Sequence, residues 1–295
     1  LPPLARRLAA SSTGYRDPVA EVDWGSLDPS RPWMPDEMVS LWGLAEWEAL
    51  APEQRRRLSQ YELIAFLELG LWLEGLFMQR LAGRVGRGAG GSSDDLAYQL
   101  HELREEAGHS LMFVELIRRS GLRALGGGIR RPRLAGAFGR LAPFDSTGFW
   151  VAILIGEAVP DQISRALYRD ERLPEAVRQV VGIHRQEEAR HIAYARQRVG
   201  AGLGALSSGR RWLLGILVNR ILGQFIGQCF YPPPAVYAAA GLPRPRALAR
   251  KARGSPYRAR IAERCAAPTV DFLEGQGLPL RQRGGSSPRG VDGLN

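Results

Sequence analysis

Apolar residues recur at helical spacing in five long stretches of the chain, and breaks rich in Gly, Pro and Ser separate them. Apolar positions at i, i+3 and i+4 are typical of helices that bury one face. Proline is tolerated at a helix start, while Gly and a Ser followed by Asp residues mark ends and starts. The pattern therefore predicts long helices over about 53–81, 93–120, 149–168, 174–199 and 208–231.

Shorter or irregular segments surround these helices. Weaker patterns predict short helices over about 35–50, 236–240 and 256–274, and Pro160 predicts a kink in the third long helix. The Gly- and Arg-rich stretch 122–143 is expected to be a crossover loop. We predict an irregular N-terminal arm over 1–34, one helical domain over 35–276 and a disordered tail over 277–295.

The composition is that of a soluble, reduced protein. The 295 residues are 45% apolar, enough for one sizeable core, and the two cysteines, Cys229 and Cys265, are expected to be free thiols. Leu1 to Ser12 lacks the apolar core of a secretory signal, so we expect a cytoplasmic protein. The most apolar run, 212–231, carries polar residues along one side, which favours a core helix over a membrane span.

A formal charge of +10 raises the question of a nucleic-acid partner. The basic residues form short, scattered groups and all but one are Arg, so we predict no nucleic-acid binding. The segment after Arg244 is the most basic. Two interpretations remain open for it, a solvated surface or a contact with an acidic protein such as a carrier protein.

The chemistry of the chain is indicated by the run from His184 to His191. At about 100° per residue, His184, Glu188 and His191 fall within an arc of roughly 60° on one helix face. The Glu-x-x-His core of this run occurs again upstream as Glu106 and His109. Two such pairs, joined by one inward Glu from each of two further helices, are how a four-helix bundle holds two iron or manganese ions.

The two additional carboxylates come from the other two long helices. Glu157 lies within an apolar run, where an unpaired carboxylate would be costly. In the first long helix Glu74 has bulky apolar neighbours on both sides, and Glu68 is the alternative. Four carboxylates balance the charge of two ferrous ions, with neutral imidazoles completing the site. The predicted metal ligands are Glu74, Glu106, His109, Glu157, His184, Glu188 and His191.

These residues resemble the site of the ferritin-like diiron oxygenases, and more narrowly that of the p-aminobenzoate N-oxygenase family. The narrowing depends on His184, because the family has a third histidine one turn before its second Glu-x-x-His. The resemblance covers roughly Tyr61 to Val199 at the level of motifs. It implies an all-α, ferritin-like four-helix bundle with additional helices, two Fe ions per chain, O2 as co-substrate and a homodimer.

The resemblance also implies an activity. A reduced diiron pair would bind O2, pass through a peroxo-diferric intermediate, and oxidise the primary amine of a small aromatic metabolite to hydroxylamine, nitroso or nitro. This would be a monooxygenase step in secondary metabolite biosynthesis, with electrons from a ferredoxin or flavin reductase. The alternatives are a diiron C–H hydroxylase, desaturase or C–C cleaving oxygenase and, from a different class, a ferroxidase.

Substrate contacts are less well indicated by the sequence. A substrate carboxylate would need an inward Arg, and Arg220 is the candidate, with Asn219 and Tyr231 after it. Five aromatic residues could line a substrate pocket or belong to the core, namely Trp72, Phe77, Phe113, Trp150 and Phe225. His101 is the one histidine outside the predicted metal site.

Overall fold

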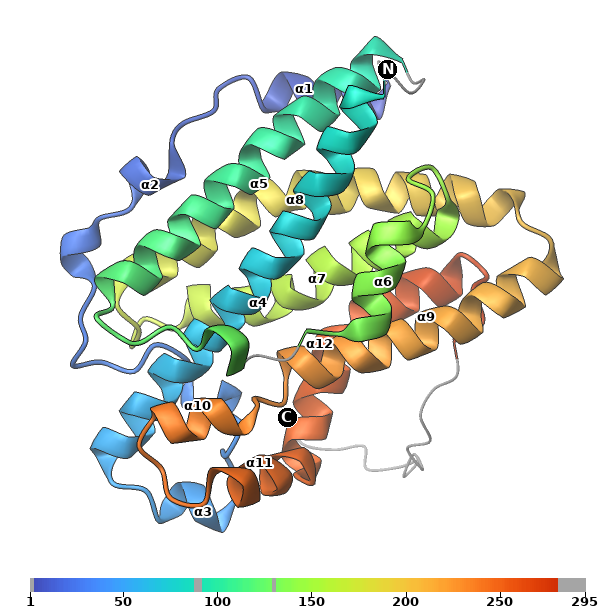
Figure 1. Ribbon diagram of the computed structural model, residues 1–295. Coiled ribbons are helices and arrows are strands. Elements are labelled where there is room, and N and C mark those ends of the chain that lie inside the picture. The colour runs from blue at the N-terminus through green and yellow to red at the C-terminus, as the bar shows by residue number, and fades with distance from the viewer. Residues whose placement is uncertain (1–2, 88–91, 129–130, 281–295) are drawn as a thin grey trace, which may run out of the picture.

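In the computed structural model, which describes residues 3–87, 92–128 and 131–280, four long helices form the central bundle. They are α4 (Pro52–Gly86), α5 (Ser93–Arg119), α7 (Thr147–Arg169) and α8 (Glu175–Ala205). Helix α4 packs along α5, α7 packs along α8, and α5 also contacts α8 (Figure 1). The predicted all-α, ferritin-like bundle is confirmed, and the described residues contain no strand.

Local sequence signals explain where these helices begin. The Ser92 hydroxyl accepts a hydrogen bond from the Asp95 backbone N–H at 3.1 Å, and Ser146 caps α7 in the same way through Phe149. Pro52 is the first residue of α4, where its missing N–H has no helical partner to lose. Helix α7 continues through Pro160 to Arg169.

Additional helices surround the bundle. The remaining elements are α1 (Leu4–Ser11), α2 (Pro18–Glu21), η1 (Trp24–Ser26), η2 (Asp36–Met38), α3 (Ala45–Glu48), η3 (Gly126–Gly128), α6 (Arg133–Leu141), α9 (Ser208–Cys229), α10 (Pro234–Ala239), α11 (Pro245–Arg253) and α12 (Pro256–Gly275). Helices α6 and α9 contact each other and both contact α7, and α12 also lies against α7 (Figure 1).

Some predicted boundaries were wrong. The single helix expected over 35–50 is only the short elements η2 and α3, because Gly43 lies between them at φ +77°. Helix α4 passes Gly83 and α8 passes Gly200, although each Gly costs about 1 kcal/mol in a helix interior. In α8 the turn beyond Gly200 buries Leu203 completely, which favours continuing the helix.

The arm and the crossover are more ordered than the sequence pattern indicated. Helices α1 and α2 of the predicted irregular arm pack against α5, and Arg6 forms an ion pair with Asp94 at 3.0 Å. The predicted crossover loop contains α6, and α11 was not predicted. Leu278 is buried at the start of the predicted tail, whereas residues 281–295 lie outside the described part of the chain.

Helix α9 covers one side of the bundle, where it contacts α6 and α7. The segment Ser208–Ala239 has the length and apolar composition of a membrane-spanning helix, with a mean hydropathy of 1.4 and 33% of its most apolar window buried. Its inner side, including Val218, Ile221 and Phe225, is buried, while Trp212 is exposed. The predicted core helix is therefore a covering helix with one buried face.

Candidate metal centre

The seven predicted ligands lie together in the centre of the bundle. Helix α4 contributes Glu74, α5 contributes Glu106 and His109, α7 contributes Glu157, and α8 contributes His184, Glu188 and His191. All seven are buried, and four of them have no exposed surface at all, Glu106, His109, Glu188 and His191. The four helices therefore surround a group of polar side chains whose burial costs free energy unless they are paired.

Two sets of ligand atoms can be distinguished within this group. In the first set, one ligand atom each from Glu74, His109, His184 and Glu188 lies within 4.8 Å of the others. The His184 Nε2 atom is 3.3 Å from Glu74 Oε1, and His109 Nδ1 is 3.3 Å from Glu188 Oε1. This arrangement of two carboxylates and two imidazoles can hold one ion.

The second set consists of Glu106, Glu188 and His191. The His191 Nδ1 atom is 3.1 Å from Glu106 Oε1 and 3.2 Å from Glu188 Oε1. Glu106 Oε2 also faces His109 Nδ1 at 3.6 Å, so both carboxylates lie between the two imidazoles. Glu188 belongs to both sets, and Glu106 also faces an imidazole of the first set, so either carboxylate could help to hold both ions.

Glu157 completes the group from α7. Burial raises the pKa of the Glu157 carboxyl well above its ordinary value, and the neighbouring Glu188 and Glu106 carboxylates raise it further. Glu74 has a raised pKa for the same reasons, first burial and then the Glu106 carboxylate. Four carboxylates so close together cannot all be ionised in a buried site without cations among them.

The residues fit two divalent ions. Five buried ligand atoms have no hydrogen-bond partner among the described residues: Glu74 Oε2, both Glu106 oxygens, His109 Nδ1 and Glu188 Oε2. Buried polar atoms are normally paired, so these atoms indicate a missing partner of positive charge. Two ferrous ions would supply four positive charges against four carboxylates and leave the site near neutral.

Two further carboxylates hold the imidazole rings from behind. The Nε2 atom of His109 is 2.9 Å from Glu187 Oε2, and that of His191 is 2.9 Å from Glu105 Oε2. The contacts run crosswise, because Glu187 on α8 holds a histidine of α5 and Glu105 on α5 holds a histidine of α8. Each carboxylate accepts the Nε2–H proton, which leaves Nδ1 as the donor atom for a metal.

Arg190 lies between these two carboxylates. Its Nη2 atom donates to Glu105 Oε1 at 2.8 Å and is 3.8 Å from Glu187 Oε1. The corresponding position in α5 is Gly108, where an added Cβ would lie 2.7 Å from the Tyr15 hydroxyl of the arm. Arg190 therefore contacts both carboxylates. The N-terminal arm fills the space at Gly108 that a corresponding arginine of α5 would need.

Sequence reasoning missed the roles of Glu105 and Glu187. The signal was present, because both helices carry a second Glu directly before the Glu-x-x-His core, giving Glu105-Glu106 and Glu187-Glu188. A repeated residue pair on two helices of one site indicates a repeated contact.

Other candidate residues lie away from the cluster. The carboxylate of Glu68 accepts hydrogen bonds from the backbone N–H groups of Leu125 and Gly126, so it holds η3 in place. Arg220 is exposed on α9, and Asn219 donates to its own helix at Gly215. Tyr231 lies under the guanidinium of Arg253. The structure therefore does not bring Arg220, Asn219 or Tyr231 to the metal cluster.

An apolar pocket opens directly beside the metal ligands. Glu74, Glu157 and His184 form one wall, and Phe113, Val181 and Phe225 are among the apolar residues of the others. Among the described residues that line it, none is an arginine or a lysine. Of the five aromatic residues considered in the sequence, Phe113 and Phe225 line this pocket, Phe77 and Trp150 pack in the core, and Trp72 lines a groove on the outer side of α4.

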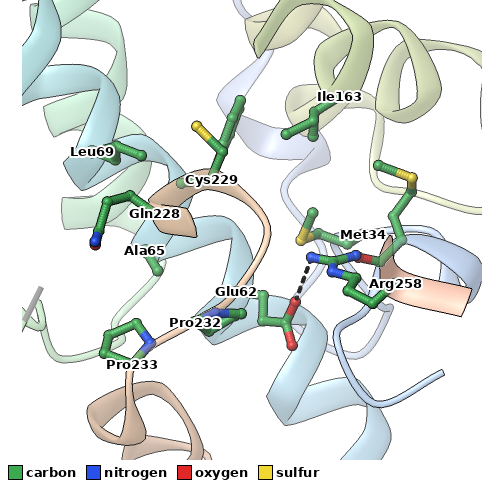
Figure 2. A pocket seen from close by; sticks show the side chains of 12 residues that line it. Met34, Glu62, Ala65, Leu69, Ile163, Gln228, Cys229, Pro232, Pro233 and Arg258 are labelled. Atoms are coloured by element: carbon green, nitrogen blue, oxygen red, sulfur yellow. Dashed lines mark hydrogen bonds and ion pairs between the residues drawn. The ribbon is translucent and has the colours of Figure 1, made fainter. Parts of the chain in front are cut away.

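A second pocket adjoins the first one, with Leu69 and Cys229 in the walls of both (Figure 2). Figure 2 shows Glu62 and Arg258 facing each other across it, with Arg258 Nη2 3.8 Å from Glu62 Oε2. Arg258 also donates to the carbonyl of Phe230 at 2.6 Å and to that of Met38. These contacts tie α12 to the chain segments before α4 and after α9. Cys229 and Cys265 are both free thiols.

The fold and the cluster together define a ferritin-like oxidoreductase with a carboxylate and histidine site for two metal ions. The family model described as p-aminobenzoate N-oxygenase AurF matches residues 3–277, and the chain belongs to this family of diiron oxygenases.

The individual proteins to which the chain is similar have low sequence identity to it. The uncharacterized proteins Rv0885 of Mycobacterium tuberculosis and Mb0909 of Mycobacterium bovis are each 24% identical over 238 residues, which is 77% of this chain and 68% of theirs. Among solved structures, two variants of an R2-like ligand-binding oxidase with a reconstituted Mn/Fe cofactor are similar in fold. One is 16% identical with a TM-score of 0.56, the other 18% with 0.54, and both cover 92% of each chain.

Proposed function

We propose that the protein is a diiron N-oxygenase that oxidises the primary amine of a small aromatic metabolite to the hydroxylamine, nitroso or nitro level. The observation that carries this proposal is the position of His184. Its Nε2 atom faces Glu74 at 3.3 Å and Glu188 at 3.6 Å, and the residue also forms part of the pocket wall. A third imidazole therefore lies where metal site and pocket meet.

The imidazole of His184 is suited to binding a metal ion at this position. Burial, and then the neighbouring His109, lower the pKa of His184 to about 4, so the ring is neutral at physiological pH and offers a lone pair to a metal. When bound, the two ions would supply the reduction of O2. An added neutral donor makes the irons more electron-rich, which favours oxygen transfer to an amine nitrogen over attack on a strong C–H bond.

The pocket supports an aromatic substrate with an apolar body. Phe113 and Phe225 offer ring faces and edges, and their apolar neighbours exclude water from the reacting nitrogen. Since no Arg or Lys lines the pocket in the described structure and His184 is neutral, a carboxylate on the ring would be buried without a cationic partner. An uncharged arylamine therefore suits this pocket better than p-aminobenzoate.

The remaining partners follow from the chemistry. Conversion of the amine to the hydroxylamine by one O2 consumes two electrons and two protons from outside the chain and releases one water, so we propose a ferredoxin or flavin reductase as the donor. The basic surface of the chain, with a net charge of +10, would attract an acidic electron donor or an acidic carrier protein.

The test is turnover of the iron-loaded protein with a panel of arylamines under ¹⁸O2, with product analysis by mass spectrometry. The proposal predicts ¹⁸O bound to the nitrogen of the product and faster turnover of uncharged arylamines than of p-aminobenzoate. It also predicts that His184→Ala loses N-oxygenation. Label on carbon would support the rival C–H hydroxylase. Release of ferric mineral without any organic product would instead indicate a ferroxidase, and either result overturns the proposal.

A further inference from the structure

Three buried aromatic side chains with polar atoms lie next to the metal ligands, toward the start of α5. Tyr98 of α5 is completely buried, and Tyr194 of α8 and Trp150 of α7 are each 1% exposed. The ring centroids of Tyr98 and Tyr194 are 4.4 Å apart, and those of Tyr194 and Trp150 are 5.3 Å apart. Rings at these distances are in contact, so the three form a continuous row, which we call the aromatic chain.

One end of the aromatic chain lies beside the metal ligands. Tyr98, Glu102 and the ligand Glu106 are spaced four residues apart on α5, so they lie within an arc of roughly 80° on one helix face. Tyr194 follows the ligand His191 by three residues on α8, about 4.5 Å along the helix axis. The charge of His191 acts on the pKa of both Tyr98 and Glu102. The chain therefore begins within electrostatic reach of the cluster.

The other end of the aromatic chain lies just below the surface. The guanidinium of Arg198 lies over the Trp150 ring, 5.5 Å from its centroid. Arg198 forms an ion pair with Asp145 at 2.9 Å, and these two side chains are 31% and 55% exposed. The three rings therefore connect the buried cluster with a partly exposed ion pair.

Each tyrosine of the chain donates its hydroxyl proton to a carboxylate. The Tyr98 hydroxyl donates to Glu102 Oε1 at 3.2 Å, and that of Tyr194 donates to Asp95 Oδ1 at 3.0 Å. Burial raises the pKa of both phenols above the ordinary value, so both keep their protons at rest. A phenol that loses an electron becomes a strong acid, and a carboxylate in hydrogen-bond contact can then take its proton.

Glu102 is a buried acid that is not needed to complete the metal site. It has no exposed surface, and its Oε2 atom has no hydrogen-bond partner among the described residues. Neither of the two sets of ligand atoms includes it. Burial raises the pKa of Glu102 to about 8, and an acceptor whose pKa is near the operating pH can take up a proton and return it. Bound ions one turn away would favour its ionised form.

Packing alone does not account for the polar atoms of the chain. Phe77 and Phe149 contact the Trp150 ring and fill the same core without any polar atom. The Trp150 Nε1 atom is buried and has no hydrogen-bond partner among the described residues. A buried polar atom without a partner costs free energy that phenylalanine would avoid. A row of three oxidisable rings beside a redox-active site indicates a role in electron transfer.

We propose that the aromatic chain passes electrons from the surface to the metal site when O2 has oxidised the site and no amine is bound. Tyr98 gives one electron to the oxidised site and its phenolic proton to Glu102, which leaves a neutral tyrosyl radical. Tyr194 then gives an electron to this radical, and Tyr98 takes its proton back from Glu102. Tyr194 meanwhile gives its own proton to Asp95.

The electron that the chain has lost is replaced from solution. Trp150 gives an electron to the Tyr194 radical, which takes its proton back from Asp95. A small thiol that meets the surface at Arg198 and Asp145 then reduces the oxidised Trp150. Two such transfers convert two thiols into one disulfide and two protons, and deliver two electrons to the metal site.

The direction of transfer follows from the chemistry of the rings. Tyrosine and tryptophan give up an electron only to a strong oxidant, so the chain does not replace a ferredoxin or flavin as the source of electrons for resting ferric ions. It acts only after O2 has reacted, and it spares the buried ligands from oxidation. The proposal rests on the O2 chemistry of the proposed function, but not on the identity of the substrate.

The first test is electron paramagnetic resonance of the iron-loaded protein, frozen at intervals after mixing with O2 without amine. We expect an organic radical whose hyperfine structure changes when the tyrosines are ring-deuterated, and Tyr98→Phe should lose it. Tyr237→Phe is the matched control, because Tyr237 of α10 is also completely buried, and it should keep the signal. Glu102→Gln should slow radical formation by about 100-fold, the low end of what a positioned base contributes.

The second test concerns the outward part of the chain and its protective effect. In the presence of thiol, Tyr194→Phe should slow the decay of the Tyr98 radical by about tenfold or more, which is about 1.4 kcal/mol in the barrier. After repeated exposure to O2 without amine, mass spectrometry should find more oxidised side chains in Tyr98→Phe than in Tyr237→Phe. All variants are compared at equal iron content, so that a loss of metal cannot imitate the effect.

Three results would each overturn the proposal. These are an iron-loaded protein that consumes O2 without forming an organic radical, a radical that persists in Tyr98→Phe, and a radical decay that is the same in Tyr194→Phe as in the unmodified protein. None of them bears on the oxidation of arylamines. A protein that forms the Tyr98 radical but oxidises no arylamine would support the aromatic chain and contradict only the proposed function.

Discussion

The crosswise contacts behind the metal site make a prediction with a defined size. Glu105 accepts hydrogen bonds from His191 Nε2 at 2.9 Å and from Arg190 Nη2 at 2.8 Å, and it is almost fully buried. Glu105→Gln keeps the shape of the side chain but removes the charge that makes the imidazole a stronger donor. Loss of such a partner costs about 10- to 100-fold in metal affinity, or about 1.4 to 2.7 kcal/mol.

The assay is a calorimetric titration with Co²⁺, an air-stable substitute for ferrous iron. We expect two bound ions in the unmodified protein and weaker binding of one of them in Glu105→Gln. Glu175→Gln is the matched control, because Glu175 is also paired with an Arg of α8 but is exposed and lies at the start of the helix, away from the metal ligands. Its titration should be unchanged.

Combining substitutions tests the crosswise pairing itself. If Glu105 acts through His191, then Glu105→Gln should add little to the effect of His191→Ala, but its effect should add fully to that of His109→Ala. Conversely, Glu187→Gln should add little to the effect of His109→Ala, but its effect should add fully to that of His191→Ala. Equal additivity with both histidine variants, or a Glu105→Gln titration identical to that of the control, would refute the reasoning.

Three further predictions concern packing, pH and metal removal. Gly108→Ala should lower the free energy of unfolding by about 1 to 3 kcal/mol in thermal denaturation, because its Cβ would lie 2.7 Å from the Tyr15 hydroxyl. The control Gly75→Ala has open space around the new Cβ and should raise the free energy of unfolding by about 0.5 to 1 kcal/mol. Equal effects of the two substitutions would contradict the described packing of the arm. Because burial raises the pKa of Glu74 and Glu157, binding of metal ions should release protons, and the metal affinity should fall as the pH falls. Calorimetry in buffers of different ionisation enthalpy measures the number of protons released. Ion binding without proton release would be inconsistent with this site. Removing the ions with a chelator should lower the melting temperature, since a ligand at 100 times its Kd contributes about 2.7 kcal/mol, and an unchanged melting temperature would show that the ions do not stabilise the fold.

The sequence predicted the helices of the bundle because their apolar positions repeat over many turns. Five of the seven candidate ligands could be chosen for the same reason, since the Glu-x-x-His and His-x-x-x-Glu spacings place the side chains on one helix face. Glu74 and Glu157 were chosen from their apolar neighbours. The structure brings all seven together. The ends of α4 and α8 were placed too early, because glycine is a stop signal whose cost is small beside the burial of a residue such as Leu203.

Other features depend on tertiary structure that a pattern does not contain. The neighbours of Glu68 are nearly as apolar as those of Glu74. Six residues along a helix turn the side chain by about 240°, so the orientation of α4 decides which of the two carboxylates faces the cluster. The same holds for Arg220, which lies on the exposed side of α9. The short helix α11 has only nine residues and is strongly basic, so its packing and not its pattern holds it helical.

The most direct test of the metal centre is a crystal structure of the protein loaded anaerobically with ferrous iron, with anomalous diffraction recorded at the iron edge. We predict two anomalous peaks between α4, α5, α7 and α8, with Glu106 and Glu188 between them and His184 bound to the ion that shares Glu74. A single peak, peaks elsewhere, or His184 turned away from both ions would contradict the account.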